Sequence, residues 1–150
     1  EIKFSSDFII GYPGETNGDF EKTLELARKV NFINTYSFIF SARPGTPSFN
    51  LKKIDNKISK KRLNIFQNIS KEIKKEYRAK LLKKTVSVLF ENKTKEERKY
   101  FGRDEFFNSV IVESDQNLTG KIENVKIHKV SQNTLFGELN LKPINKNCAA

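Results

Sequence analysis

The sequence contains almost no cysteine and no long apolar run, and both absences narrow the possible classes of protein. The single cysteine, Cys148, cannot form a disulfide within the chain and cannot build a cysteine metal site by itself. No stretch approaches the roughly 18 to 20 apolar residues that a membrane-spanning helix needs. We therefore expect no internal disulfide, no metal ligands in this chain and no membrane segment, and we expect the protein to be cytoplasmic.

The first residue is not methionine, and a predicted strand follows almost at once. We therefore expect the chain to be a fragment whose natural N-terminus lies upstream. Its 150 residues, of which 37% are hydrophobic, include thirteen Phe and provide enough apolar surface for one ordinary domain or two small ones.

The net charge of +10 is concentrated in one segment. Residues 52–84 hold thirteen Lys or Arg against three Asp or Glu, whereas residues 1–51 carry net −1 and residues 85–150 carry net +1. Such a concentration of positive charge attracts a polyanion, and nucleic acid is the commonest polyanion in a cytoplasm. A solvated face of a Lys-rich helix explains the same pattern, so charge alone leaves both interpretations open.

Residues 1–51 have the pattern of a strand–helix–strand unit. A short apolar run ends at residue 10 and is followed by a turn with two glycines and a proline. Helical spacing begins after Thr16, and Asp19 stands three residues on, as in a capping box. Aromatic and β-branched residues at 34–41 predict a second strand, which a right-handed crossover places parallel to the first.

Ligands of such units bind at the carboxyl ends of the strands, and both predicted strands end in a special turn. The turn at 11–16 has glycines that allow close approach of a ligand, and the turn at 42–47 presents Arg43 at the same edge. The first turn is not a phosphate-binding P-loop because no Gly-Lys-Ser/Thr follows. Each turn taken alone is better explained by an ordinary structural role than by a cofactor site.

Residues 59 to about 82 predict the longest helix. Ser59 can cap it, isoleucines then recur every fourth residue, and no Gly or Pro interrupts the pattern. We interpret residues 52–84 as a basic connector helix whose apolar stripe packs on either the preceding or the following domain.

From Thr85 onward the apolar period changes to two, and about five short antiparallel strands fit into some 60 residues. This size and strand count are typical of a small Greek-key barrel of the oligonucleotide-binding (OB) type. The predicted fold class is therefore α/β followed by all-β. The predicted β-domain covers residues 85–142, and residues 143–150 form a tail.

Three segments follow one another in a distinctive order. Residues 7–16 read Asp-Phe-Ile-Ile-Gly-Tyr-Pro-Gly-Glu-Thr, residues 19–24 read Asp-Phe-Glu-Lys-Thr-Leu, and residues 36–47 read Tyr-Ser-Phe-Ile-Phe-Ser-Ala-Arg-Pro-Gly-Thr-Pro. Together they resemble the methylthiotransferase family of radical S-adenosylmethionine enzymes, most of all the branch that modifies isopentenylated adenosine in tRNA. Further blocks at 101–103, 118–121 and 133–137 look like the family's C-terminal TRAM domain.

The resemblance implies both a fold and cofactors. Members of this family have an N-terminal domain, a partial β/α (TIM-like) barrel and a TRAM domain, and they hold two 4Fe-4S clusters through cysteines in the first two. One cluster binds S-adenosylmethionine and cleaves it to a 5′-deoxyadenosyl radical, and the other takes part in inserting sulfur at C2 of the adenine. By this resemblance the chain supplies the C-terminal end of the barrel and the TRAM domain. The cluster cysteines would lie upstream, so the fragment alone is expected to be inactive.

The resemblance also points to candidate site residues. The turn at 11–16 would lie near bound S-adenosylmethionine, and the cofactor-binding candidates are Gly11, Pro13, Gly14, Glu15, Thr16 and Arg43. The TRAM domain would hold the anticodon stem-loop of tRNA, and the candidates for phosphate contacts are Arg103, Lys121 and Arg78. Phe106 and Phe107 either belong to the barrel core or, if exposed, stack on unpaired bases of the anticodon loop.

The leading hypothesis is therefore an enzyme that, as a full-length monomer, methylthiolates C2 of N6-isopentenyladenosine next to the anticodon, with sulfur and electron donors that the sequence does not identify. A non-catalytic RNA-binding module is an alternative, although it has no need of the two cofactor-type turns. A methylthiotransferase acting on threonylcarbamoyladenosine in tRNA or on a ribosomal protein is a third possibility, and the basic connector weighs against a protein substrate.

Overall fold

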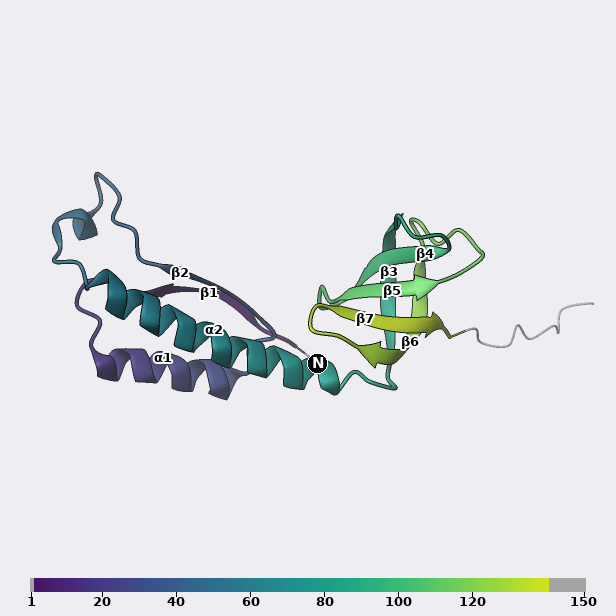
Figure 1. The fold of residues 1–150 in the computed structure, drawn as a ribbon, viewed down its shortest axis with the longest axis horizontal. Helices are drawn as coiled ribbons and strands as arrows, with labels where there is room; N and C mark the ends of the chain where they lie inside the picture. Colours follow the sequence, from purple (N-terminus) through teal and green to yellow (C-terminus); the bar gives the residue numbers. More distant parts are fainter. Residues whose placement is uncertain (1, 141–150) are drawn as a thin grey trace, which may run out of the picture. The chain divides into compact units, whose positions relative to one another are not determined.

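The computed structural model describes residues 2–140 (Figure 1). The end of the predicted β-domain, the predicted tail at 143–150 and Cys148 lie outside the described residues. The chain divides between Tyr77 and Arg78 into two compact units.

The N-terminal unit is a two-stranded parallel sheet with two helices on one face (Figure 1). Strand β1 (Ser5–Ile10) leads through α1 (Asn17–Val30) to β2 (Asn34–Ile39), so the predicted strand–helix–strand unit with parallel strands is confirmed. A short 3-10 helix, η1 (Pro47–Asn50), precedes the long helix α2 (Asn56–Ala79). Within residues 2–140, no helix combines the length and the apolar character that crossing a membrane requires.

The core of this unit lies between β1 and both helices. Ile10 from the strand and Phe66 from α2 are fully buried, and the Phe8 ring packs 4.5 Å from the Phe66 ring, centroid to centroid. The apolar stripe of α2 therefore packs on the preceding unit, which decides between the two alternatives left by the sequence. The other buried members of this core are Phe20, Leu24, Ala27, Ile69 and Ile73.

Helix α2 begins at Asn56, three residues before the predicted cap Ser59. The side chain of Asp55 accepts a hydrogen bond from the backbone N–H of Lys57 at 2.6 Å, so a carboxylate satisfies the first turn instead. Ser59 is buried within the helix, and a Cβ added to Gly11 would come within 2.5 Å of its Oγ. The prediction that Ser59 caps this helix was wrong, because the helix already begins at Asn56. Ser59 lies inside the helix instead, where its small side chain lets the helix pack closely against the turn after β1.

The sheet face opposite the helices carries exposed apolar side chains. Ile9, Tyr36 and Phe38 are 52%, 64% and 55% exposed, and they project from neighbouring positions of the two strands. Exposed apolar patches of this kind commonly mark a surface that contacts other protein or a ligand.

The C-terminal unit is a closed five-stranded barrel, as the period-two pattern predicted. Its strand order around the barrel is β3-β4-β5-β7-β6. One pair, β5 with β7, is parallel, whereas the sequence predicted antiparallel strands throughout. A ring with an odd number of strands cannot alternate direction all the way round, so closure requires such a pair. The bounds are β3 (Thr85–Lys93), β4 (Lys99–Asp104), β5 (Ser109–Glu113), β6 (Ile122–Val130) and β7 (Thr134–Leu139).

Alternate residues of each strand fill the barrel. Gly137 and Gly102 occupy inward positions at which a Cβ would come within 2.3 Å of Val125 Cγ1 and 2.5 Å of Leu89 O, respectively, so larger residues do not fit there. The buried apolar core consists of Val88, Phe90, Tyr100, Val110, Val112, Leu118, Val125, Ile127 and Leu135.

Candidate cofactor edge and nucleic-acid interface

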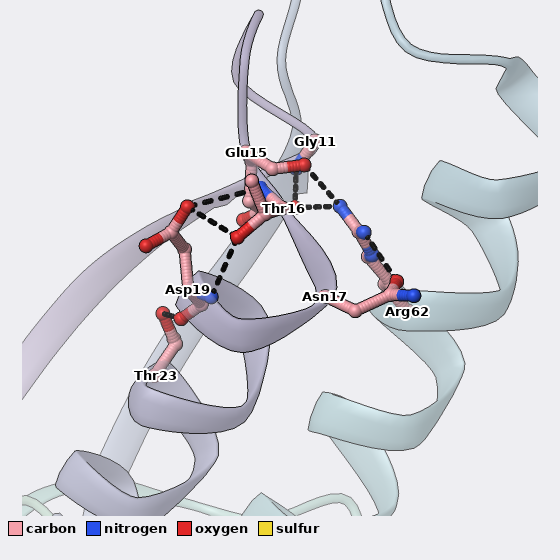
Figure 2. Close-up of polar contacts among 7 residues, drawn as sticks. All are labelled: Gly11, Glu15, Thr16, Asn17, Asp19, Thr23 and Arg62. Atoms are coloured by element: carbon pink, nitrogen blue, oxygen red, sulfur yellow. Dashed lines mark hydrogen bonds and ion pairs between the residues drawn. The ribbon is translucent and has the colours of Figure 1, made fainter.

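The turn between β1 and α1 is closed by its own hydrogen bonds (Figure 2). The backbone N–H of Glu15 donates to the carbonyl of Tyr12 at 2.9 Å, and the backbone N–H of Gly11 donates to Glu15 Oε2 at 3.1 Å. Gly11 and Gly14 have φ of +76° and +89°, in the left-handed region that favours glycine. The shape of the turn is therefore set by contacts within the chain.

Arg62 of α2 ties this turn to the helix (Figure 2). Its Nη1 lies 2.6 Å from Glu15 Oε2 and 3.1 Å from the Glu15 carbonyl, and its Nη2 lies 2.8 Å from Asn17 Oδ1. The side chains of Arg62 and Glu15 are only 8% and 11% exposed, and the guanidinium lies 5.5 Å from the centroid of the Phe20 ring. The carboxylate of Glu15, a predicted cofactor residue, thus takes part in a shielded internal ion pair.

Thr16 and Asp19 form the predicted capping box at the start of α1. Thr16 Oγ1 accepts a hydrogen bond from the Asp19 backbone N–H at 3.1 Å, and Asp19 Oδ2 accepts one from the Thr16 backbone N–H at 3.0 Å. The Thr16 hydroxyl also donates to Asp19 Oδ2 at 2.7 Å. Hydrogen bonds from this hydroxyl and then from the backbone N–H hold the pKa of Asp19 below its usual value. The Thr16 side chain therefore starts the helix.

The two turns that follow the strands meet at one edge of the sheet. The backbone N–H of Phe40 donates to the carbonyl of Ile10 at 2.8 Å, and the rings of Tyr12 and Phe40 lie edge to face with centroids 5.0 Å apart. This is the carboxyl edge at which the sequence predicted a ligand.

The backbone of both turns is open at this edge. A Cβ added to Gly14 or to Gly45 would meet no heavy atom within 4 Å, so a ligand can approach the main chain at either position. The exposed Arg43 precedes Gly45, and its carbonyl accepts a hydrogen bond from the Thr46 hydroxyl at 2.8 Å. The half-buried Pro13 lies in the first turn. The edge thus combines open main chain with one cation, which fits an anionic or carboxylate-bearing ligand.

The predicted phosphate-binding residues differ in their exposure. Arg78 is buried, with Nε 3.4 Å from Asn108 Oδ1 and with Nη1 hydrogen-bonded to the carbonyl of Gln132, which favours a structural role for its guanidinium. Lys121 is exposed just before β6. Arg103 is partly exposed, and its Nε lies 3.0 Å from Glu91 Oε1.

The two adjacent phenylalanines lie in the turn between β4 and β5. Asp104 Oδ1 holds this turn by accepting hydrogen bonds from the backbone N–H groups of Phe106 at 2.9 Å and Asn108 at 2.8 Å. Phe107 adopts φ of +60° and is 74% exposed, whereas Phe106 is half-buried. Phe107 therefore does not belong to the barrel core.

A row of apolar side chains crosses the outer face of the barrel, and the sequence analysis did not identify it. Phe101 of β4 lies opposite Ile111 of β5, which in turn lies opposite Phe136 of β7, and Lys129 of β6 lies opposite Phe136 on its other side. All three apolar side chains are partly exposed. Each of them alternates with buried neighbours along its strand and so faces outward, and the strand order brings the three together.

Comparison with known proteins agrees with this architecture. The profile of the TRAM domain family matches residues 79–139, which include the whole five-stranded barrel. The chain is 50% identical over 141 residues to a protein of Pelagibacter ubique named tRNA-2-methylthio-N(6)-dimethylallyladenosine synthase. Proteins of the same name from Orientia tsutsugamushi and Buchnera aphidicola are 42% and 40% identical to it.

These alignments cover 92% to 93% of the chain but only 31% to 32% of each relative, so the chain spans about a third of their length. Residues 79–139 thus match the TRAM domain family. Over nearly its whole length the chain is homologous to a part of the tRNA-2-methylthio-N(6)-dimethylallyladenosine synthases, which confirms the resemblance seen in the sequence.

Proposed function

We propose that this chain is the C-terminal third of a radical S-adenosylmethionine enzyme that methylthiolates C2 of N6-isopentenyladenosine next to the anticodon of tRNA. The observation that carries the proposal is the extent of the similarity. It spans 141 residues, so it includes the strand–helix–strand unit and the barrel together. A non-catalytic RNA-binding module would need the barrel alone.

The exposed face of the N-terminal sheet supports a larger catalytic domain. Ile9, Tyr36 and Phe38 lie on the side of β1 and β2 away from the helices, where the interior of a β/α barrel would be. Upstream strands of the full-length protein would pair with the sheet and continue the barrel. The apolar face of β1 and β2 would then be covered in the barrel interior. The same strands would remove the open edges of the sheet.

The carboxyl edge of the sheet is our candidate for part of the S-adenosylmethionine site. The open main chain at Gly14 and Gly45 would allow close approach of the cofactor, and Arg43 would contact its carboxylate or the substrate. Glu15 and Thr16 would act indirectly, through the shape of the turn and the start of α1. When bound to one of two 4Fe-4S clusters, which we expect to be held by cysteines outside this chain, S-adenosylmethionine supplies the radical that starts the reaction.

The barrel is the part that we expect to bind the anticodon stem-loop of the tRNA. We expect the full-length enzyme to be a cytoplasmic monomer. Individual exposed cations of the barrel can bind phosphates, and Arg103 and Lys121 are exposed enough to contribute.

The experiment that tests this proposal is expression of the full-length protein in a bacterial strain whose own methylthio synthase has been deleted. We expect mass spectrometry of tRNA nucleosides to show 2-methylthio-N6-isopentenyladenosine restored, with an empty vector as the control. Accumulation of unmodified N6-isopentenyladenosine would contradict the proposal. Methylthiolation of threonylcarbamoyladenosine instead would assign the protein to the other tRNA branch.

A further inference from the structure

We propose that the outer row of the barrel, formed by Phe101, Ile111 and Phe136, is a stacking surface for unpaired RNA bases. This inference rests on the proposed function for its partner, tRNA, and identifies the surface that would recognise it. It differs from the assignment suggested by the sequence, which placed the stacking residues at Phe106 and Phe107.

The row is continuous because it crosses three hydrogen-bonded strands (Figure 1). Directly opposed residues on neighbouring strands have Cβ atoms about 4.5 to 5.5 Å apart, so the three side chains form one apolar strip. The barrel core lies on the other side of these strands, formed by residues such as Val110, Val112 and Leu135. The strip is therefore not needed to fill the interior.

Each aromatic ring in the row has a cation against it. The guanidinium carbon of Arg103 lies 5.5 Å from the centroid of the Phe101 ring, and Nζ of Lys129 lies 5.5 Å from the centroid of the Phe136 ring. A base that stacked on either ring would bring its own phosphate within reach of a cation. Aromatic surfaces combined with basic residues are the usual means by which small β-barrels bind single-stranded nucleic acid.

Three carboxylates share the outer face with the row, Glu91 near Arg103, Glu113 opposite Lys99 and Glu138 opposite Lys126. Glu91 pairs with Arg103, but the two side chains are 39% and 43% exposed, and ion pairs this exposed are weak. A phosphate can therefore replace the carboxylate as the partner of Arg103. The cation against each aromatic ring favours a polyanion over an apolar protein surface, so we assign the row to RNA.

The test measures binding of this chain to a fluorescent stem-loop RNA with an unpaired anticodon-type loop, with a fully paired duplex as the comparison. The variants Phe101→Leu and Phe136→Leu keep an apolar side chain at each position and remove the aromatic ring. Phe49→Leu, which changes an exposed phenylalanine in η1 of the N-terminal unit, is the matched control. Thermal unfolding of each variant checks that the barrel remains folded.

We expect each row variant to weaken binding of the stem-loop about tenfold, because base–aromatic stacking contributes about 1 to 3 kcal/mol per base. Binding of the duplex and the slope of log affinity against log salt should not change, because no charge is removed. Lys129→Gln should instead reduce the magnitude of that slope by about one. Phe49→Leu should match the wild type.

Four results would overturn the inference. Unchanged stem-loop affinity in both row variants would exclude the row, and an effect confined to Phe107→Leu would assign stacking to the turn. Self-association of the wild type that is lost in Phe101→Leu, measured by sedimentation, would mean that a second copy covers the row.

If the wild-type chain prefers the stem-loop while the row variants bind as well as it does, this inference fails and the proposed function stands. If the wild type binds no RNA, the inference fails with the assignment of tRNA binding to the barrel, and the nucleoside assay tests the enzymatic proposal separately.

Discussion

Removing Arg62 from its ion pair with Glu15 should strongly destabilise the N-terminal unit. Arg62→Met keeps most of the aliphatic side chain but removes all three guanidinium hydrogen bonds to Glu15 and Asn17. The Glu15 carboxylate would then stay about nine-tenths buried, and the backbone N–H of Gly11 would be its remaining hydrogen-bond donor within the described residues. Removing one partner of a buried pair typically costs about 3 to 5 kcal/mol, because the other charge is left uncompensated.

The assay is urea unfolding monitored by amide hydrogen exchange. The exchange of amides in β1 and α1 reports on the N-terminal unit, and the exchange of amides in the barrel strands reports on the barrel. We expect Arg62→Met to lower the free energy of unfolding of the N-terminal unit by about 3 kcal/mol or more, and to leave the barrel unchanged. The double variant Glu15→Gln/Arg62→Met should lose less, because no buried charge remains. Lys99→Gln breaks the exposed pair with Glu96 and should destabilise the protein far less, because solvent screens this pair. A loss for Arg62→Met as small as that for Lys99→Gln would refute this reasoning.

Three further predictions concern the N-terminal unit. Gly14→Ala should lower the free energy of unfolding by about 1 to 2 kcal/mol, because the residue has a positive φ. Gly11→Ala should lower it by about 1 to 3 kcal/mol more, because a Cβ there also meets Ser59. Equal losses for the two variants in urea unfolding would contradict the clash. Because the pKa of Asp19 is lowered on folding, the contribution of its carboxylate to stability should be present above pH 3.8, the ordinary pKa, and lost as the pH falls through the lowered pKa. An NMR titration of the folded protein that gave Asp19 its ordinary pKa would exclude this. Limited proteolysis should cut within residues 1–51 before it cuts the barrel, because within the described residues both strands of the small sheet are edge strands; uniform resistance would argue against it.

Much of the local structure could be predicted from the sequence because it depends on neighbouring residues. The capping box at Thr16 and Asp19 spans three residues, and the glycine-rich turn after β1 follows directly from its composition. The change of apolar period at Thr85 correctly separated helix from barrel strands. The start of α2 was placed three residues late because Asp55 and Ser59 are both acceptable caps. In the structure the side chain of Asp55 accepts the hydrogen bond of the first turn, and Ser59 packs against Gly11 instead.

The candidate site depended more on tertiary structure. Glu15 looked like a cofactor residue because of its position in the turn, but its partner Arg62 lies 47 residues away and was one of thirteen similar cations in the basic segment. The row of Phe101, Ile111 and Phe136 likewise requires the order of the strands, including the parallel pair that closes the barrel.

Local patterns in the chain thus determine the elements, their order along the chain and the family that they resemble, because hydrophobic period, caps and turns act over a few residues. Which distant side chains meet is decided by packing and by the closure of the barrel. Those long-range contacts form the ion pair of Arg62 with Glu15 at the turn after β1 and the outer face that we assign to RNA.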